Sequence, residues 1–496
     1  MTHDNAVPRL PAVSVAGAQA LTYGELAALV GTVERALRHD RKALVLCAGD
    51  RDLPTLLAYL AGLRLGHTVM FMPASAEILS AYQPEFVLPA PGTEPGLRDL
   101  GYVPGEDVTA GVSVFRRRPT RPANDSHTND IHTNDIHEDT ALLLATSGST
   151  GSPKAVRLSY SGLAGNTAAV IRALGITAAD CAPTTLPITH AYGLSVVNSH
   201  LSAGAGIMLS NRSPLSLAMW DELTRAGATS LAAVPTTYAA FGPAHVALLE
   251  RTRIHTMTQA GARLADELTV RLWRLMAQRN GRFFVMYGQT EATSRIACLD
   301  PADLPARLGS VGVAVPGGTV TIRPTPAHVG ARPGEGAVQY VGPGVMLGYA
   351  TSRADLGRGA EVGILDTGDL GYLREGYLYL TGRTKRIVKV LGVRASLDDL
   401  ERMVERPGQP AAVVSGADDV VCLFGAGDPA VHEAQRRQLV DSLGVPNRHV
   451  EFRAVERLPL TSGGKVDYRR LVAAAATRGR SGGEVGEVAR ALRSRT

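Results

Sequence analysis

The sequence predicts an α/β protein with a large N-terminal domain and a small C-terminal domain. Short apolar runs, typical of buried strands, alternate with longer stretches in which apolar residues recur at helical spacing. This alternation favours a doubly wound sheet, in which helices cover the faces of mostly parallel strands. A chain of 496 residues is also long for one hydrophobic core, so two or three domains are expected.

The first elements follow this alternation in order. Residues 21–25 (Leu-Thr-Tyr-Gly-Glu) predict the start of a capped helix that continues to residue 37. Further along the chain the pattern predicts a buried strand at 43–47, a helix at 53–65, a strand at 68–72 and a buried strand at 141–145.

A polar segment at 119–139 interrupts the large domain. It holds three copies of a five-residue unit, which begin at Asn124, Asn129 and Asn134 and each contain a histidine. Histidines five residues apart share no face of a regular helix, so a low-complexity linker is a better interpretation than a metal site.

A domain boundary is expected near 383–385, which gives domains at 1–383 and 384–477. Within the second domain the pattern predicts a helix at 397–404, strands at 411–414 and 420–424, and a helix at 431–443. Residues 478–496 are rich in Arg, Gly and Ser and predict a loose basic tail, with too little apolar content for a membrane-binding helix.

Composition narrows the class of protein. Apolar residues make up 45% and charged residues 20%, which is ordinary for a soluble enzyme. The net charge of +5 does not argue for nucleic acid, although it would not repel an acidic protein partner. Four scattered cysteines suggest a reducing compartment without disulfides or zinc. No apolar run approaches the length of a membrane span, so we expect a cytoplasmic protein.

The most informative run, Thr-Ser-Gly-Ser-Thr-Gly-Ser-Pro-Lys, follows the predicted strand at 141–145. Its glycines let successive backbone N–H groups converge on one point, and its hydroxyls and lysine add donors and a positive charge. It predicts a cradle for the polyphosphate of a nucleotide, although it is not the common P-loop, and a flexible Ser/Gly surface loop is the alternative. The candidate residues are Thr146, Ser147, Gly148, Ser149, Thr150, Gly151 and Lys154.

Six further strings follow in order, at 187–193, 259–264, 286–293, 366–369, 382–385 and 462–467. Together with the run at 146–154 they resemble the motifs of the adenylate-forming superfamily, which includes acyl-CoA synthetases, peptide-synthetase adenylation domains and luciferases. The resemblance spans residues 20–475 and is closest to acyl-CoA or acyl-carrier-protein ligases. It implies an acid–thiol ligase that uses ATP and Mg²⁺ to convert a carboxylic acid to acyl-AMP. The acyl group would then pass to the pantetheine thiol of CoA or an acyl carrier protein. It also implies a multi-lobed large domain and a mobile small one.

Activation of an acid with ATP brings one anion against another, so the site must neutralise charge and align the reactants. Lys154 and its loop suit the β- and γ-phosphates, and a carboxylate beside phosphate oxygens is a natural Mg²⁺ ligand. The resemblance gives that metal role to Glu291, for which a solvated surface carboxylate is the alternative. It places Thr290 on the α-phosphate and Tyr287, followed by Gly288, against adenine.

The resemblance also assigns residues to the ribose and to the edge of the adenine pocket. Asp369 would accept hydrogen bonds from two adjacent ribose hydroxyls, with Arg383 as a further donor. For Asp366 an ordering role in the turn is the better expectation. Gly261 and Ala262 would flank adenine and the acyl group, whereas no role is assigned to Arg263, which stands where relatives often have proline.

Lys465 is the strongest catalytic candidate. Its glycine-rich loop could bring an ammonium group onto the substrate carboxylate and α-phosphate, which is worth about 10²–10³ in rate. A lone lysine in such a turn is otherwise a surface residue. The resemblance makes Lys385 a hinge and places Lys389 and Gly392 along a tunnel for the thiol. Residues 395–401 depart from the glutamate-bearing segment of relatives, which leaves the details of the second half-reaction open.

The motif around His190 bears on the acid. Amino-acid-adenylating relatives carry an aspartate there, and Ala191 in this chain would leave a substrate ammonium group unpaired. Ala191, Tyr192 and Val196 instead predict an apolar slot for a fatty, branched or aromatic acid. His190 would lie near the carboxylate and the acceptor path, or else be a plain core histidine. The open alternatives are an amino-acid-adenylating enzyme that loads a carrier protein, a degenerate nucleotide-binding partner protein and a luciferase-like oxygenase.

Overall fold

The computed structural model describes residues 12–15, 20–90, 92–105, 108, 111–118, 136–145, 154–326, 328, 331–406, 408–416, 419–461 and 465–476. The predictions for 146–153, the repeats at 124–135, residues 462–464 and the tail lie outside these ranges. The chain divides into a first unit, Met1–Thr319 with Tyr340–Leu365, and a second unit, Val320–Gln339 with Asp366–Thr496. The boundary expected at residue 383 marks the start of the domain that is expected to be mobile, and it stays a prediction.

The first unit contains an eight-stranded sheet in which β7, β3, β2 and β4 run parallel. Its central strands are buried on both faces, which explains their unbroken apolar runs. The order is β18 (Gly348–Ala350), β8 (Ala155–Ser159), β7 (Thr140–Ala145), β3 (Thr68–Phe71), β2 (Leu44–Cys47), β4 (Phe86–Leu88), β6 (Phe115–Arg117) and β5 (Tyr102–Pro104).

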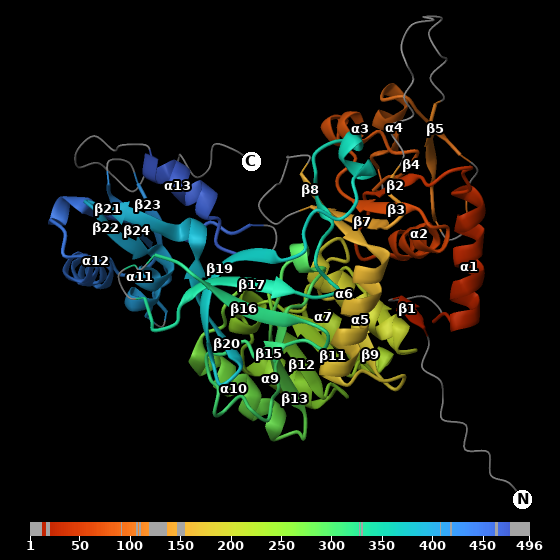
Figure 1. Cartoon of the computed structure of the whole chain (residues 1–496). Helices are drawn as coiled ribbons and strands as arrows, with labels where there is room; N and C mark the ends of the chain where they lie inside the picture. Colours follow the sequence, from red (N-terminus) through yellow and green to blue (C-terminus); the bar gives the residue numbers. More distant parts are fainter. Residues whose placement is uncertain are drawn as a thin grey trace, which may run out of the picture. The chain divides into compact units, whose positions relative to one another are not determined.

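Capped helices cover this sheet, as the sequence predicts. Helix α1 (Tyr23–Ala36) begins at a capping box formed by Thr22 and Glu25, and α2 (Leu53–Arg64) begins where Asp52 accepts from the Thr55 N–H. Helix α2 packs against β2 and β3, and α1 packs on α2 (Figure 1). The shorter helices are α3 (Ala76–Tyr82) and α4 (Glu94–Asp99). Ile136, at the end of the expected linker, is buried in the core of this sheet.

A second α/β layer of the first unit is built on parallel strands β11 (Ser230–Ala233), β12 (Thr256–Gln259) and β13 (Arg282–Tyr287). Antiparallel strands β14 (Ala297–Leu299) and β15 (Val313–Ala314) extend the sheet. A small parallel sheet contains β1 (Val13–Val15), β10 (Gly206–Leu209) and β9 (Cys181–Pro183). The helices here are α5 (Tyr160–Leu174), α6 (Ala191–Ser202), α7 (Leu217–Ala226), α8 (Pro235–Ala239), α9 (Pro243–Glu250) and α10 (Asp266–Ala277).

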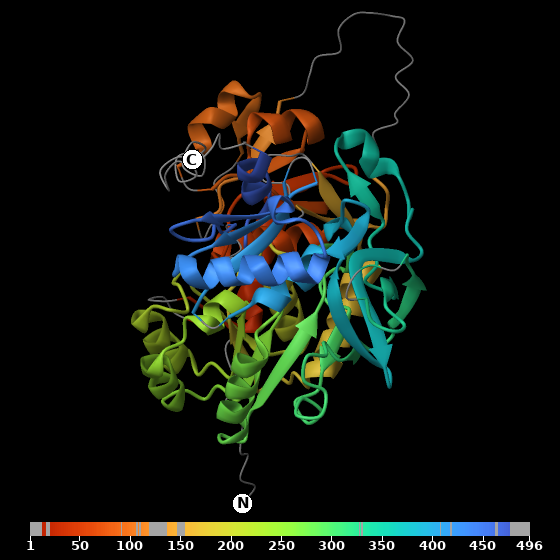
Figure 2. The same ribbon diagram turned by 90° about the vertical axis from the view of Figure 1, so that its left-hand side faces the viewer.

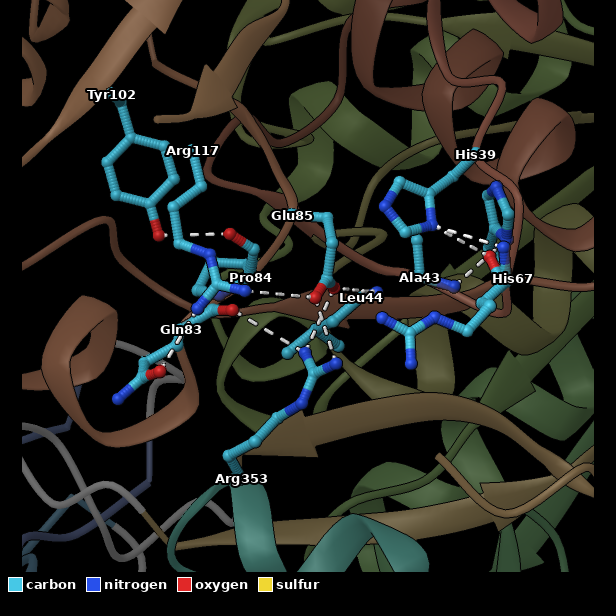
Figure 3. A network of polar contacts seen from close by, with 11 residues as sticks. His39, Ala43, Leu44, His67, Gln83, Pro84, Glu85, Tyr102, Arg117 and Arg353 are labelled. Carbon is cyan, nitrogen blue, oxygen red and sulfur yellow. Dashed lines mark hydrogen bonds and ion pairs between the residues drawn. The ribbon is translucent and has the colours of Figure 1, made fainter. Parts of the chain in front are cut away.

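A polar network joins the segment 340–365 to the start of the first unit (Figure 3). Both guanidinium Nη atoms of Arg353 bond to the Glu85 carboxylate at 2.9 Å, and the Leu44 N–H donates to the same group at 2.8 Å. These partners, together with Arg117, outweigh the effect of burial, and the pKa of Glu85 is lowered. Residues far apart in the sequence are thereby held at one edge of the sheet.

The second unit combines a four-stranded sheet, a hairpin and a three-stranded sheet. Val413, Val421 and Leu423 of the three-stranded sheet face α11 and α12, whereas Ala412, Val414 and Phe424 face α13. Figure 1 labels these helices on opposite sides of the strands, and Figure 2 shows α12, the long blue helix, running across one face. The elements are β16 (Thr319–Pro324), β17 (Gly336–Val341), β19 (Leu365–Arg374), β20 (Tyr377–Arg383), β21 (Ile387–Val390), β22 (Val393–Ser396), α11 (Leu397–Val404), β23 (Ala411–Ser415), β24 (Val421–Gly425), α12 (Pro429–Leu443), β25 (Val450–Ala454) and α13 (Tyr468–Ala476).

Two further expectations concern the whole chain. The four cysteines are all buried and free. Among the described residues, no helix combines the length and hydropathy that a membrane span requires.

Candidate active site

Strands β7 and β8 frame the predicted phosphate loop. They pair antiparallel, with Ala145 opposite Ala155, so the two ends of the loop are neighbours. Lys154 is the first described residue after the loop, and its Nζ lies 3.6 Å from the centroid of the Tyr349 ring. A cation is thus held at the base of the loop by an aromatic face.

Tyr349 also contacts the predicted metal ligand. Its hydroxyl donates to Glu291 Oε1 at 3.0 Å. Burial, followed by the charge of Glu291, raises the pKa of Tyr349 far above its ordinary range, so the hydroxyl stays a donor. Lys154 and Glu291 therefore contact the same tyrosine. Sequence reasoning missed Tyr349, because it lies in β18 outside every motif.

The turn after β13 places Tyr287, Thr290 and Glu291 within five residues of one another. Tyr287 is buried, and Thr290 begins the short 3-10 helix η1 (Thr290–Ala292). A Cβ atom at Gly288 would lie 1.7 Å from the Ser294 carbonyl oxygen, so only glycine fits there. This close approach fixes the path of the backbone from Tyr287 to Glu291.

Gly261 and Ala262 lie just beyond the end of β12. Gly261 has a φ of +100°, and the Gln259 side chain donates to the Ala262 carbonyl oxygen at 2.6 Å. Because β12 and β13 are parallel neighbours, this turn and the turn after Tyr287 leave the same edge of the sheet. Ligands of open α/β sheets bind at that edge. Arg263 is half exposed and pairs with Asp266, consistent with the lack of an assigned role.

The residues of the first unit fit Mg²⁺ bound to a nucleotide. In the described part of the chain there is no group of three or more His, Cys, Asp or Glu that could hold a metal by itself. Mg²⁺ beside phosphates typically uses one or two protein carboxylates, with phosphate oxygens and water as its other ligands. Glu291 could supply one such carboxylate, and Lys154, which contacts the same tyrosine, could pair with phosphate oxygens.

In the second unit, three predicted site residues lie together. Asp369 and Arg383 are opposite one another on β19 and β20, and Arg383 Nε lies 3.0 Å from Asp369 Oδ1. Burial lowers the pKa of Lys465, the Arg383 charge lowers it further, and the Asp369 charge opposes the shift. The ammonium group of Lys465 is therefore close to both partners.

Backbone contacts hold Lys465 in place. Leu460 and Val466 pair antiparallel, and the Thr461 N–H donates to the Lys465 carbonyl oxygen at 2.7 Å. Lys465 thus lies on a narrow hairpin. As expected, Asp366 orders a turn: its carboxylate accepts from the Gly368 N–H at 3.4 Å and pairs with Arg323 at 2.6 Å.

The predicted hinge residue Lys385 is exposed, in a short 3-10 helix, Thr384–Arg386. The next residue, Arg386, is fixed by Asp398 at 2.6 Å and Glu401 at 3.0 Å, and it lies over the Tyr468 ring. Thus the segment 395–401, which departs from the family pattern, carries the anchor of the hinge. Lys389 is exposed on β21, and Gly392 has a φ of +89° in the turn to β22.

Helix α6 carries the predicted acyl pocket. His190 precedes its first residue and is exposed, so it is not a core histidine. Tyr192 and Val196 line a cavity, whereas Ala191 does not. The cavity also receives Arg295, which sequence reasoning missed although it lies four residues after Glu291. The wall of the cavity combines apolar side chains with hydroxyl and charged groups.

The sequence of this chain matches known proteins. The profile of the AMP-binding enzyme family matches residues 2–350. The chain is 29% identical to indoleacetate–CoA ligase of Aromatoleum aromaticum, over 91% of this chain and 93% of the relative. It is 30% identical to oxalate–CoA ligase of Arabidopsis thaliana over 57% of this chain, a match that spans about half of that relative (55%).

The fold is also found in solved structures. That of o-succinylbenzoate CoA synthetase (MenE) from Bacillus subtilis, in complex with its acyl-adenylate intermediate, has a TM-score of 0.72 at 22% identity, and the match covers 97% of both chains. The large α/β part and the small C-terminal part are therefore those of adenylate-forming enzymes. Since the family profile covers most of the sequence, this chain belongs to the AMP-binding enzyme family.

Proposed function

We propose that this chain uses ATP to convert a carboxylic acid to acyl-AMP and then transfers the acyl group to the thiol of CoA. The proximity of Lys465 to the Asp369–Arg383 pair carries the proposal. If Asp369 binds the ribose, as the family resemblance implies, the ammonium group of Lys465 is within the same part of the nucleotide site. A positive charge there serves a reaction at the α-phosphate.

The residues of the chain have distinct tasks in the first step. The acid carboxylate attacks the α-phosphorus, the bond to the bridging oxygen breaks, and pyrophosphate leaves. Lys465 offsets the negative charge that gathers around the α-phosphate. Lys154 holds the departing phosphates, and Glu291, oriented by Tyr349, holds Mg²⁺, which supplies further positive charge when bound. Thr290 donates to the α-phosphate, and Tyr287 packs on adenine.

In the second step the thiolate of CoA attacks the acyl carbonyl carbon and AMP leaves. We infer that rotation at Lys385 removes Lys465 and admits the pantetheine arm along Lys389 and Gly392. The relatives' names favour CoA as the acceptor, and an acyl carrier protein is the competing acceptor in the test below. Four buried free thiols suit a reducing compartment, and we place the reaction in the cytoplasm.

The test is acid-dependent exchange of pyrophosphate into ATP, with fatty, aromatic, amino and dicarboxylic acids in one panel. We expect exchange with one class of acid, followed by thioester formation when CoA is added. If exchange occurs without consumption of CoA but a holo carrier protein is loaded, the acceptor is the carrier protein and not CoA. ATP binding without exchange for any acid would contradict the proposed function.

A further inference from the structure

A cavity lies between helices α5 and α6 and the parallel strands β11, β12 and β13. About 450 Å³ of space lies within it, part of which is open to solvent. Val170 and Leu174 contribute apolar surface, and Tyr192, Ser195 and Val196 line it from α6. Two of these residues belong to the predicted acyl pocket, so the cavity continues that pocket.

Arg295 contributes a guanidinium group to this lining. The residue is only 2% exposed. Its Nη2 donates to Ser195 Oγ at 3.0 Å, and the group lies 4.5 Å from the centroid of the Tyr192 ring. Its Nε is buried without a hydrogen-bond partner, and no carboxylate of the described residues forms an ion pair with it.

An unpaired buried cation is costly. Moving a charged group out of water is unfavourable unless it is paired and hydrogen-bonded. The Ser195 hydroxyl and the Tyr192 ring offset only part of this desolvation cost. Burial accordingly lowers the pKa of Arg295. A guanidinium group presents donors in a planar fork that matches the oxygens of a carboxylate or sulfonate. The free donor edge of Arg295 therefore suits an anion that arrives with a ligand.

The other charged groups on the cavity wall already have partners. Asp180 accepts from the Thr177 N–H at 2.8 Å and the Thr229 hydroxyl at 3.0 Å, and it lies 3.4 Å from His255. Arg282 donates to the Thr256 hydroxyl at 3.0 Å. The interactions of Asp180 therefore do not involve Arg295. Arg282, like Arg295, has a hydroxyl partner and no carboxylate partner among the described residues, but it is partly exposed. Arg295 is therefore the buried guanidinium group of the wall that lacks a counter-charge.

We propose that Arg295 binds a second anionic group of the acid, so that the preferred substrate is a dicarboxylic or sulfonated acid. The inference rests on the proposed function: one carboxylate is activated at the nucleotide, and the distal anion enters the cavity and pairs with Arg295. This substrate class differs from the fatty, branched or aromatic acid that the sequence predicts.

The experiment uses matched pairs of acids that differ in one charge. Unbranched diacids from oxalate to adipate are compared with their monomethyl esters in pyrophosphate exchange. We expect kcat/KM for the best diacid to exceed that for its monoester by about 30-fold or more, as for a buried ion pair. Arg295→Met should remove most of this preference by lowering kcat/KM for the diacid alone. Arg295→Lys should restore part of it.

Arg172→Met is the matched control, because Arg172 is exposed on α5, and it should leave both rates unchanged. A thermal unfolding curve shows whether Arg295→Met is folded. If that variant does not fold, the ratio of kcat/KM for diacid and monoester in the unaltered protein tests the proposal by itself. Equal rates with diacids and monoesters, or a preference for monoacids, would overturn the role of Arg295 and leave the proposed function intact. No exchange with any acid would overturn both.

Discussion

At the scale of single residues, the surroundings of Lys465 predict how adenylate formation depends on pH. Because burial and Arg383 lower its pKa below the ordinary 10.5, the ammonium form is lost at a lower pH than for an exposed lysine. We expect the exchange rate at saturating ATP to fall on the alkaline side with a midpoint below that value. Arg383→Met should raise the midpoint, and Arg383→Lys should not. An unchanged midpoint in Arg383→Met would contradict the contact.

Gly288 gives a second prediction at this scale. Gly288→Ala forces the turn between Tyr287 and Glu291 to move, since the new methyl group would overlap the Ser294 carbonyl oxygen. We expect a loss of about 100-fold in exchange activity, as for a catalytic group displaced by about 1 Å. Gly31→Ala, in an open helical position of α1, is the control and should be neutral or stabilise by about 0.5–1 kcal/mol. Activity and the free energy of unfolding are measured for both.

Residues within motifs could be predicted from the sequence, whereas their partners could not. The motifs, through the family that they resemble, indicated Lys154, Glu291, Asp369 and Lys465 as candidates. Tyr349 contacts Glu291 across 58 positions, a pairing that arises only when β18 joins β8. Arg295 could not be predicted, because the burial of a guanidinium group without a carboxylate partner is a property of the folded chain.

At the scale of secondary structure, local signals predicted the elements well. Helix α11 has the expected bounds, and α1, α2 and α12 differ from expectation by one or two residues at their ends. Caps and apolar periodicity are encoded by neighbouring residues. The antiparallel additions β14 and β15, and the pairing of β18 with β8, depend on contacts between distant segments and were not predicted.

Asp180 joins the segments that precede three strands, and its substitution tests how much this contributes to stability. Its carboxylate binds groups that precede β9, β11 and β12, and these bonds outweigh burial and lower its pKa. A lowered pKa means that the carboxylate stabilises the fold above its ordinary value of 3.8, and that this contribution is lost as the pH falls. Asp180→Asn should therefore cost about 2 kcal/mol at pH 7.

The measurement for Asp180→Asn is denaturant unfolding at several pH values. The difference from the unaltered protein should shrink below about pH 4, where the unaltered protein loses its advantage. A constant difference from pH 7 to pH 3 would show that the charge of Asp180 contributes nothing.

At the scale of the whole molecule, the chain enters the second unit at Val320, returns to the first at Tyr340 and leaves it again after Leu365. The sequence predicts the boundary of the mobile part near residue 383, and the order of motifs carries no information on where the segment 320–339 packs. The pair formed by Arg353 and Glu85 fixes the returning segment (Figure 3).

In Arg353→Met, the charged partner that remains for the Glu85 carboxylate among the described residues is Arg117, at 3.4 Å. We expect a loss of about 3 kcal/mol in the free energy of unfolding. Removing one member of a largely buried ion pair leaves the charge of the other buried without full compensation. The exposed Arg98→Met is the control and should change stability by less than about 0.5 kcal/mol. A loss no larger than that of the control would show that the pair is not needed to hold the returning segment.

The central claim is that one chain performs both half-reactions and that Lys465 serves only the first. The most direct measurement compares Lys465→Ala with the unaltered protein in two assays: acid-dependent pyrophosphate exchange, and thioester formation from supplied acyl-AMP and CoA. We predict a loss of about 100-fold or more in exchange, with thioester formation nearly unchanged. An equal loss in both assays, or none in exchange, would contradict this account.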